Sequence, residues 1–120
     1  MLARQKNSPL SDDAARLLCE RSLEHTGDYY QWRTDPRLNW RSPLLLTDSQ
    51  ALDLLTAIQS PSLVMTSPAV KKYLGEEKMQ QRLSAIGRCT HIDVDGHHHF
   101  HMEDAKSTGA SISDFLLDGD

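Results

Sequence analysis

Four of the six histidines in this chain fall within the five positions 97–101. They belong to the segment 94–104, which reads Val-Asp-Gly-His-His-His-Phe-His-Met-Glu-Asp. Imidazole has an unperturbed pKa nearer neutrality than any other side chain, so such a cluster can act as a general base, as metal ligands or as a pH-sensitive surface. The choice among these three depends on the elements that hold the segment.

A metal site is the first alternative. His97 and His99, or His99 and His101, could offer imidazole ligands to a divalent metal. A structural zinc site normally needs four ligands, and Cys19 and Cys89 are too far apart in the sequence to complete one. We therefore predict no native metal and no cofactor, and we expect both cysteines to be free, buried thiols in a reducing compartment.

The composition limits the class of protein. With 120 residues, 38% hydrophobic residues, 25% charged residues and a net charge of −4, the chain has the properties of one soluble globular unit. It lacks the basic excess that nucleic-acid binding requires. No apolar run is long enough to span a membrane, and the first seven residues contain no signal core, so we expect a cytoplasmic location.

Hydrophobic periodicity predicts helices that alternate with strands. The short apolar run 63–66 indicates a strand buried on both faces, as in a parallel sheet, and the alternating segment 89–94 indicates a second strand with one wetter face. Helices are predicted over 11–24, 47–60, 76–86 and 103–117. The second of these begins with a Thr-x-x-Gln capping box at Thr47, and Gly27 is placed at the end of the first.

The segments between these elements are expected to be irregular. Residues 27–40 concentrate aromatic, arginine and turn-forming residues, which suits either the rim of an active site or a surface loop pinned by its two tryptophans. Residues 67–75 read as a connection. Ligands of parallel α/β sheets bind beyond the carboxyl ends of the strands, and the histidine segment begins there. Two short parallel strands are too few for a stable sheet, so the remaining strands must come from elsewhere.

The order of these segments resembles a known superfamily. Residues 60–65 (Ser-Pro-Ser-Leu-Val-Met), the strand 90–94 and the segment 96–103 together resemble the C-terminal part of α/β-hydrolase-fold serine hydrolases. Residues 30–38 (Tyr-Gln-Trp-Arg-Thr-Asp-Pro-Arg-Leu) resemble the cap-to-sheet connection of the serine hydrolase-like branch. The resemblance implies an α/β fold, with a cap remnant and its connection in residues 1–46 and the C-terminal part of the hydrolase core in residues 47–120.

The resemblance also assigns a role to one histidine. In that family the catalytic histidine follows a Gly-x pair after the last strand, and an acidic residue comes five positions later. Gly96, His97 and Glu103 fit this pattern around His98. His98 would then be the general base that takes the proton of a nucleophilic serine and returns it to the leaving group. His97, His99 and His101 would shape the loop.

Two further side chains are candidates for substrate contacts. Trp32 lies in the aromatic segment and Phe100 lies within the histidine segment. For Trp32 the alternative is a core anchor, which is the more common role of tryptophan.

The rest of a catalytic triad is absent from the sequence. No Gly-x-Ser-x-Gly elbow occurs, and the usual place of the acid, after the strand 63–66, holds no carboxylate in residues 67–73. The acid lies outside the chain, or Asp35 or another carboxylate replaces it, or the parent has lost activity.

We therefore predict the C-terminal half of a serine hydrolase-like α/β hydrolase that cleaves ester or similar acyl bonds of a small-molecule substrate and associates with the missing hydrolase half. The isolated chain is predicted to be inactive. The alternative is a non-catalytic module that binds a partner through its exposed sheet edge.

Overall fold

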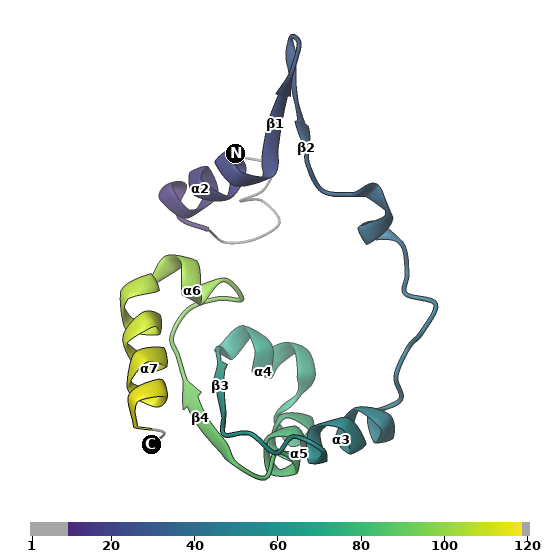
Figure 1. The fold of residues 1–120 in the computed structure, drawn as a ribbon, viewed down its shortest axis with the longest axis vertical. Helices are drawn as coiled ribbons and strands as arrows, with labels where there is room; N and C mark the ends of the chain where they lie inside the picture. The colour runs from purple at the N-terminus through teal and green to yellow at the C-terminus, as the bar shows by residue number, and fades with distance from the viewer. Residues whose placement is uncertain (1–9, 119–120) are drawn as a thin grey trace. The chain divides into compact units, whose positions relative to one another are not determined.

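The computed structural model describes residues 10–118, and these fall into two compact units, one that ends at Leu45 and one that begins at Leu46 (Figure 1). Each unit is described by itself. Within the described range, no helix has the length and apolar character needed to cross a membrane.

The first unit begins with helix α2 (Asp12–Ser22). Ser11 caps it, because its side-chain oxygen accepts a hydrogen bond from the Ala14 backbone N–H over 3.2 Å. Asp12 and Asp13 lie in the first turn, where a negative charge offsets the helix dipole. The predicted helix is confirmed, and it ends two residues before the predicted end.

A β-hairpin follows this helix directly. Strands β1 (Leu23–Thr26) and β2 (Tyr29–Trp32) pair antiparallel, and the chain turns between them at Gly27 and Asp28. Gly27 has a φ of 63°, a conformation that tight hairpin turns need and that glycine adopts without a steric cost. The predictions that Gly27 ends a helix and that residues 27–40 are irregular throughout were therefore wrong.

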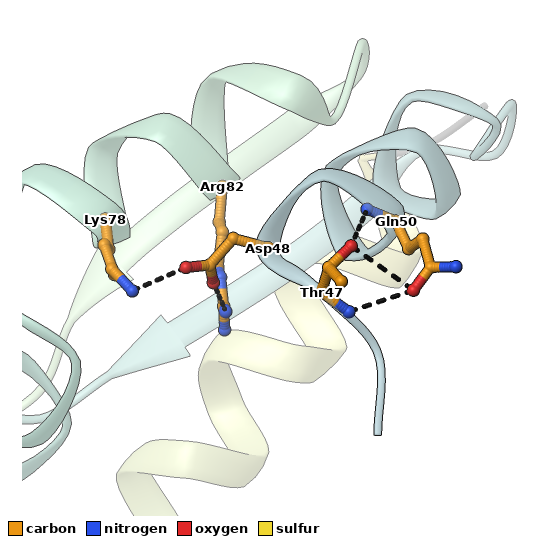
Figure 2. A network of polar contacts seen from close by, with 5 residues as sticks. All are labelled: Thr47, Asp48, Gln50, Lys78 and Arg82. Atoms are coloured by element: carbon orange, nitrogen blue, oxygen red, sulfur yellow. Dashed lines mark hydrogen bonds and ion pairs between the residues drawn. The ribbon is translucent and has the colours of Figure 1, made fainter. Parts of the chain in front are cut away.

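The second unit opens with helix α3 (Asp48–Thr56). Its capping box is complete: the Gln50 backbone N–H donates to Thr47 Oγ1 over 3.2 Å, and the Thr47 N–H donates to Gln50 Oε1 over 3.0 Å (Figure 2). The prediction of this helix start is confirmed, although the helix ends four residues early. Asp48, the first residue of α3, links this helix to helix α5 (Glu76–Ala85).

This link between α3 and α5 is ionic. Asp48 Oδ2 accepts from Lys78 Nζ over 2.6 Å, and Asp48 Oδ1 accepts from Arg82 Nη2 over 3.2 Å (Figure 2). These contacts, with the hydrogen bond from Lys78 as the main cause, hold the pKa of Asp48 below its usual value. All three side chains are more than a third exposed, so the bridge contributes more to orientation than to stability.

Residues 67–75 were predicted to be a connection, but most of them form helix α4 (Pro68–Leu74). Proline is favoured at the first helical position because its missing N–H would have no partner there. Gly75, with a φ of 86°, separates α4 from α5.

Strands β3 (Ser62–Thr66) and β4 (Cys89–Asp93) form a two-stranded parallel sheet. The register pairs Val64 with His91 and Thr66 with Asp93. Residues 62–65 are only half-buried, which corrects the prediction of a strand buried on both faces. Cys19 and Cys89 are free thiols, as predicted, but both are half-exposed rather than buried.

The chain ends in two helices, α6 (Phe100–Glu103) and α7 (Ala105–Leu117). The prediction gave one helix from Glu103. The break falls at Asp104, whose side chain caps α7 by accepting from the Ser107 N–H over 3.0 Å. Along α7, four residues at helical spacing line one groove: Thr108, Ile112, Phe115 and Leu116.

Candidate active site

The histidine segment leaves the sheet at the carboxyl end of β4. The Val94 backbone N–H donates to the Thr66 carbonyl oxygen over 2.8 Å, which extends the β3–β4 ladder by one residue. Gly96 follows with a φ of 109°. A Cβ at this glycine would lie 3.4 Å from the Phe100 Cβ and would also strain the backbone. Gly96 therefore lets the chain turn sharply from strand to helix.

His98 lies in a tight turn within this loop. The Phe100 N–H donates to the His97 carbonyl oxygen over 3.1 Å, which closes a four-residue turn with His98 at its second position. The His98 side chain is exposed, and its ring packs edge-on against His99 at a centroid distance of 4.9 Å. Among residues 10–118 the His98 imidazole has no hydrogen-bond partner. The loop thus presents an imidazole that a group from outside the described chain can engage.

Two neighbouring histidines, His99 and His101, lie close to each other in the same segment. The His99 ring lies edge-on to the His101 ring at 6.0 Å, and His101 contributes with Phe100 to the wall of a groove beside the sheet. In the part of the chain that the structure describes, no three His, Cys, Asp or Glu side chains are arranged to hold a metal ion.

A polar cluster joins the two strand ends just before this loop. Thr66 Oγ1 donates to Asp93 Oδ1 over 2.8 Å and lies 2.8 Å from His91 Nε2. Lys71 Nζ donates to Asp93 Oδ2 over 2.7 Å. The hydrogen bond from Lys71, followed by that from Thr66, holds the pKa of Asp93 below its usual value, and Asp93 raises the pKa of Lys71 in return.

This cluster was not predicted, although the alternation of β4 places His91 and Asp93 on one face. It does not have the geometry of a relay triad. The same nitrogen, His91 Nε2, faces both the Thr66 hydroxyl at 2.8 Å and Asp93 Oδ1 at 3.4 Å. In a triad, the two ring nitrogens of the base bond to the nucleophile and the acid separately. The cluster therefore stabilises the end of the sheet from which the loop with His98 extends.

The position directly after β3, where an acid is expected from the resemblance, holds Ser67. Its hydroxyl is fully buried and has no hydrogen-bond partner among the residues described. A serine cannot supply the negative charge that would stabilise a protonated His98.

Asp35 and Trp32 belong to the first unit. Asp35 caps the 3-10 helix η1 (Pro36–Asn39) and forms a two-pronged ion pair with Arg37, with Oδ1–Nε at 3.0 Å and Oδ2–Nη2 at 2.6 Å. This contact holds the pKa of Asp35 below its usual value. Both Asp35 oxygens are thus already bonded within the unit, so the role of this residue as the catalytic acid stays a prediction.

Trp32, at the end of β2, is half-exposed and lines a groove of about 540 Å³ with Ser22, Thr34, Pro36 and Asn39. This exposure does not fit the alternative of a core anchor within the described residues, and the substrate contact stays a prediction. Phe100 lines a different groove, in the second unit.

Comparison with known proteins shows which proteins the chain resembles. It is 31% identical over 124 residues to a serine hydrolase-like protein of Dictyostelium discoideum, in a match that covers 93% of this chain and 34% of that protein. A serine hydrolase-like protein of Danio rerio is 23% identical over 115 residues, covering 92% of this chain and 35% of the relative. The chain is related to the serine hydrolase-like branch of the α/β hydrolases. No family model matches it.

Solved structures share the fold of this chain. A hypothetical protein of Pseudomonas aeruginosa superposes with a TM-score of 0.81 at 28% identity, covering 96% of this chain and 42% of that one. The thioesterase domain from the curacin biosynthetic pathway has a TM-score of 0.69 at 22% identity over 96% of this chain and 41% of its own, a likeness of fold. The chain is thus α/β with parallel strands, and it spans about a third of the length of its serine hydrolase-like relatives.

Proposed function

We propose that this chain is the C-terminal part of a serine hydrolase-like α/β hydrolase that cleaves ester or similar acyl bonds of a small molecule, with His98 as the general base. The observation that carries the proposal is the place of His98: an exposed imidazole in a tight turn, just past the carboxyl end of the last parallel strand. Ligands of parallel α/β sheets bind at this end. The relatives named serine hydrolase-like support a hydrolase-type function in general.

The proposed chemistry gives His98 two proton transfers. As a serine oxygen attacks the carbonyl carbon of the substrate, its proton passes to His98, and the protonated imidazole then donates that proton to the leaving-group oxygen. In the second half of the reaction His98 takes a proton from water, which attacks the acyl-enzyme, and returns it to the serine. No cofactor takes part in these steps.

The nucleophile and the acid come, in this proposal, from a part of the hydrolase outside these 120 residues. The sequence lacks a Gly-x-Ser-x-Gly elbow, and the exposed His98 imidazole forms no hydrogen bond within residues 10–118, so its two nitrogens are open to both partners. Asp35 is the alternative acid, and it would have to accept a hydrogen bond from His98 in addition to those that it already accepts from Arg37. Phe100 and Trp32 are proposed to contact the acyl or leaving group.

A chimaera tests this function. The segment of the Dictyostelium discoideum relative that matches this chain is replaced by residues 1–120, and hydrolysis of a p-nitrophenyl ester is measured. We expect turnover by the chimaera and none by the isolated chain or by the relative from which the exchanged segment is removed. A chimaera that folds, as judged by a cooperative melt, and hydrolyses no faster than the relative without that segment would contradict the proposal.

A further inference from the structure

Ser67 is the first residue after strand β3, at the carboxyl end of the parallel sheet. Its backbone is still extended, with a φ of −110° and a ψ of 163°. Because extended residues alternate between the two faces of a sheet, the Ser67 side chain lies on the same face as Leu63 and Met65. These two residues line a groove with Phe100 of the histidine segment. Ser67 is therefore on the side of the sheet where that segment lies.

The Ser67 hydroxyl is fully buried, and its Oγ forms no hydrogen bond with any group in residues 10–118. Ser67 precedes helix α4, but its side chain does not cap the helix. The Val70 and Lys71 N–H groups donate to the Ser67 carbonyl oxygen instead. Buried hydroxyls in folded proteins nearly always have a hydrogen-bond partner, because burial without one is unfavourable. We therefore expect the partner of Ser67 Oγ to come from outside the described residues.

The acid that His98 requires has the chemistry of such a partner. A general-base histidine is oriented by a carboxylate on its second ring nitrogen. The resemblance places that carboxylate directly after β3, and Ser67 occupies this position. A carboxylate from another part of the hydrolase must reach the same place beside the histidine segment, next to Ser67. An ionised carboxylate accepts several hydrogen bonds, so it can accept one from His98 and one from Ser67 together.

We infer that Ser67 is a positioning residue for the catalytic acid, because its buried hydroxyl donates a hydrogen bond to the carboxylate that orients His98. This inference rests on the proposed function, in which that carboxylate comes from outside these 120 residues. The bond satisfies the Ser67 hydroxyl and favours the charged form of the carboxylate, which is the form that stabilises a protonated His98. Ser67 acts through the acid and does not contact the substrate.

Ser67→Ala in the chimaera tests this role. The substitution removes one oxygen and keeps the rest of the side chain. Ser62→Ala, the same change at the amino end of β3, is the matched control. Hydrolysis of the p-nitrophenyl ester is measured against pH, because the pH midpoint of kcat/KM follows the ionisation of the base and responds to the acid beside it.

We expect Ser67→Ala to lower kcat/KM by about threefold to tenfold. Its pH midpoint should rise by about 0.3 to 0.5, because a carboxylate that has lost the Ser67 donor holds the proton of His98 more tightly. Ser62→Ala should change the rate by less than about twofold and leave the midpoint where it is. In the isolated chain, Ser67→Ala should not speed amide exchange at Val70, since no bond of the hydroxyl is lost there.

Three results would overturn the inference. The first is a rate and midpoint that Ser67→Ala leaves unchanged in an active chimaera, which contradicts this role alone. The second is a lower rate with an unchanged midpoint, because the partner of the hydroxyl would then be a neutral group. The third is faster exchange at Val70 in the isolated Ser67→Ala chain, because the hydroxyl would then have its partner within the chain. A folded chimaera without hydrolysis would contradict the proposed function, and the role of Ser67 with it.

Discussion

Thr66 on β3 and Asp93 on β4 face each other in the register of the parallel sheet, and the Thr66 hydroxyl donates to the Asp93 carboxylate over 2.8 Å. Thr66 is almost fully buried, at 3% exposure. The same residue accepts from the Val94 N–H through its carbonyl oxygen. Thr66 therefore fixes both the end of the sheet and the start of the loop that carries His98.

Loss of the Thr66 hydroxyl should loosen this junction. Thr66→Val keeps the shape of the side chain but removes the donor to Asp93, which should cost about 1 kcal/mol locally, or about a fivefold faster amide exchange at Val94. Thr90→Val, on the exposed opposite face of β4, is the control and should leave the exchange rate nearly unchanged. Equal exchange in the two variants would show that the cluster does not hold the strand ends.

The ion pair between Lys71 and Asp93 should appear in a pH titration. The lowered pKa of Asp93, caused first by Lys71, means that this carboxylate stabilises the fold above its unfolded pKa of about 3.9 and loses that effect as the pH falls through the folded value. Lys71→Met should raise the Asp93 pKa measured by carboxyl ¹³C NMR and make stability fall less steeply below about pH 4. Lys72→Met should leave the Asp93 pKa where it is. An Asp93 pKa that does not move in Lys71→Met would refute the assigned cause.

The same substitution, glycine to alanine, should change stability in opposite directions at two positions. Gly96→Ala should destabilise the histidine loop by about 1–2 kcal/mol, because Gly96 has a φ of 109° and the new Cβ would meet Phe100. Gly109→Ala, inside α7 with open space around it, should instead stabilise that helix by about 0.5–1 kcal/mol. Amide exchange at Phe100 and along α7 measures the two effects. Protection at Phe100 that is unchanged in Gly96→Ala would contradict the proposed role of Gly96.

The elements that the sequence predicted correctly depend on local chemistry. The capping box at Thr47 forms from residues three apart, and the alternation across residues 89–93 places Thr90 and Ile92 on the face that lines a groove with Phe115, while His91 and Asp93 face the other way. Local patterns also misled where proline and glycine have two uses. Pro68 lies in the segment 67–75, which was predicted to be a connection, but it begins α4, and Gly27 was taken to end a helix but turns a hairpin.

The remaining features depend on contacts that a local pattern does not contain. The bond between Thr66 and Asp93 joins residues 27 positions apart and requires the register of β3 against β4. The division of the last helix at Asp104 depends on the backbone of one residue. The position of His98 beyond the end of the last strand was predicted from the resemblance and from Gly96. In our proposal, its catalytic partners lie in another part of the hydrolase.

The most direct test of the central claim is serine labelling of the chimaera by a fluorophosphonate probe, compared between His98→Ala and the neighbouring variants His97→Ala and His101→Ala. Loss of the general base should lower the labelling rate by at least about a hundredfold in His98→Ala, while both neighbours should label within about threefold of the unmodified chimaera. Labelling that persists in His98→Ala, or that is lost equally in all three variants, would contradict the assignment of His98 as the base.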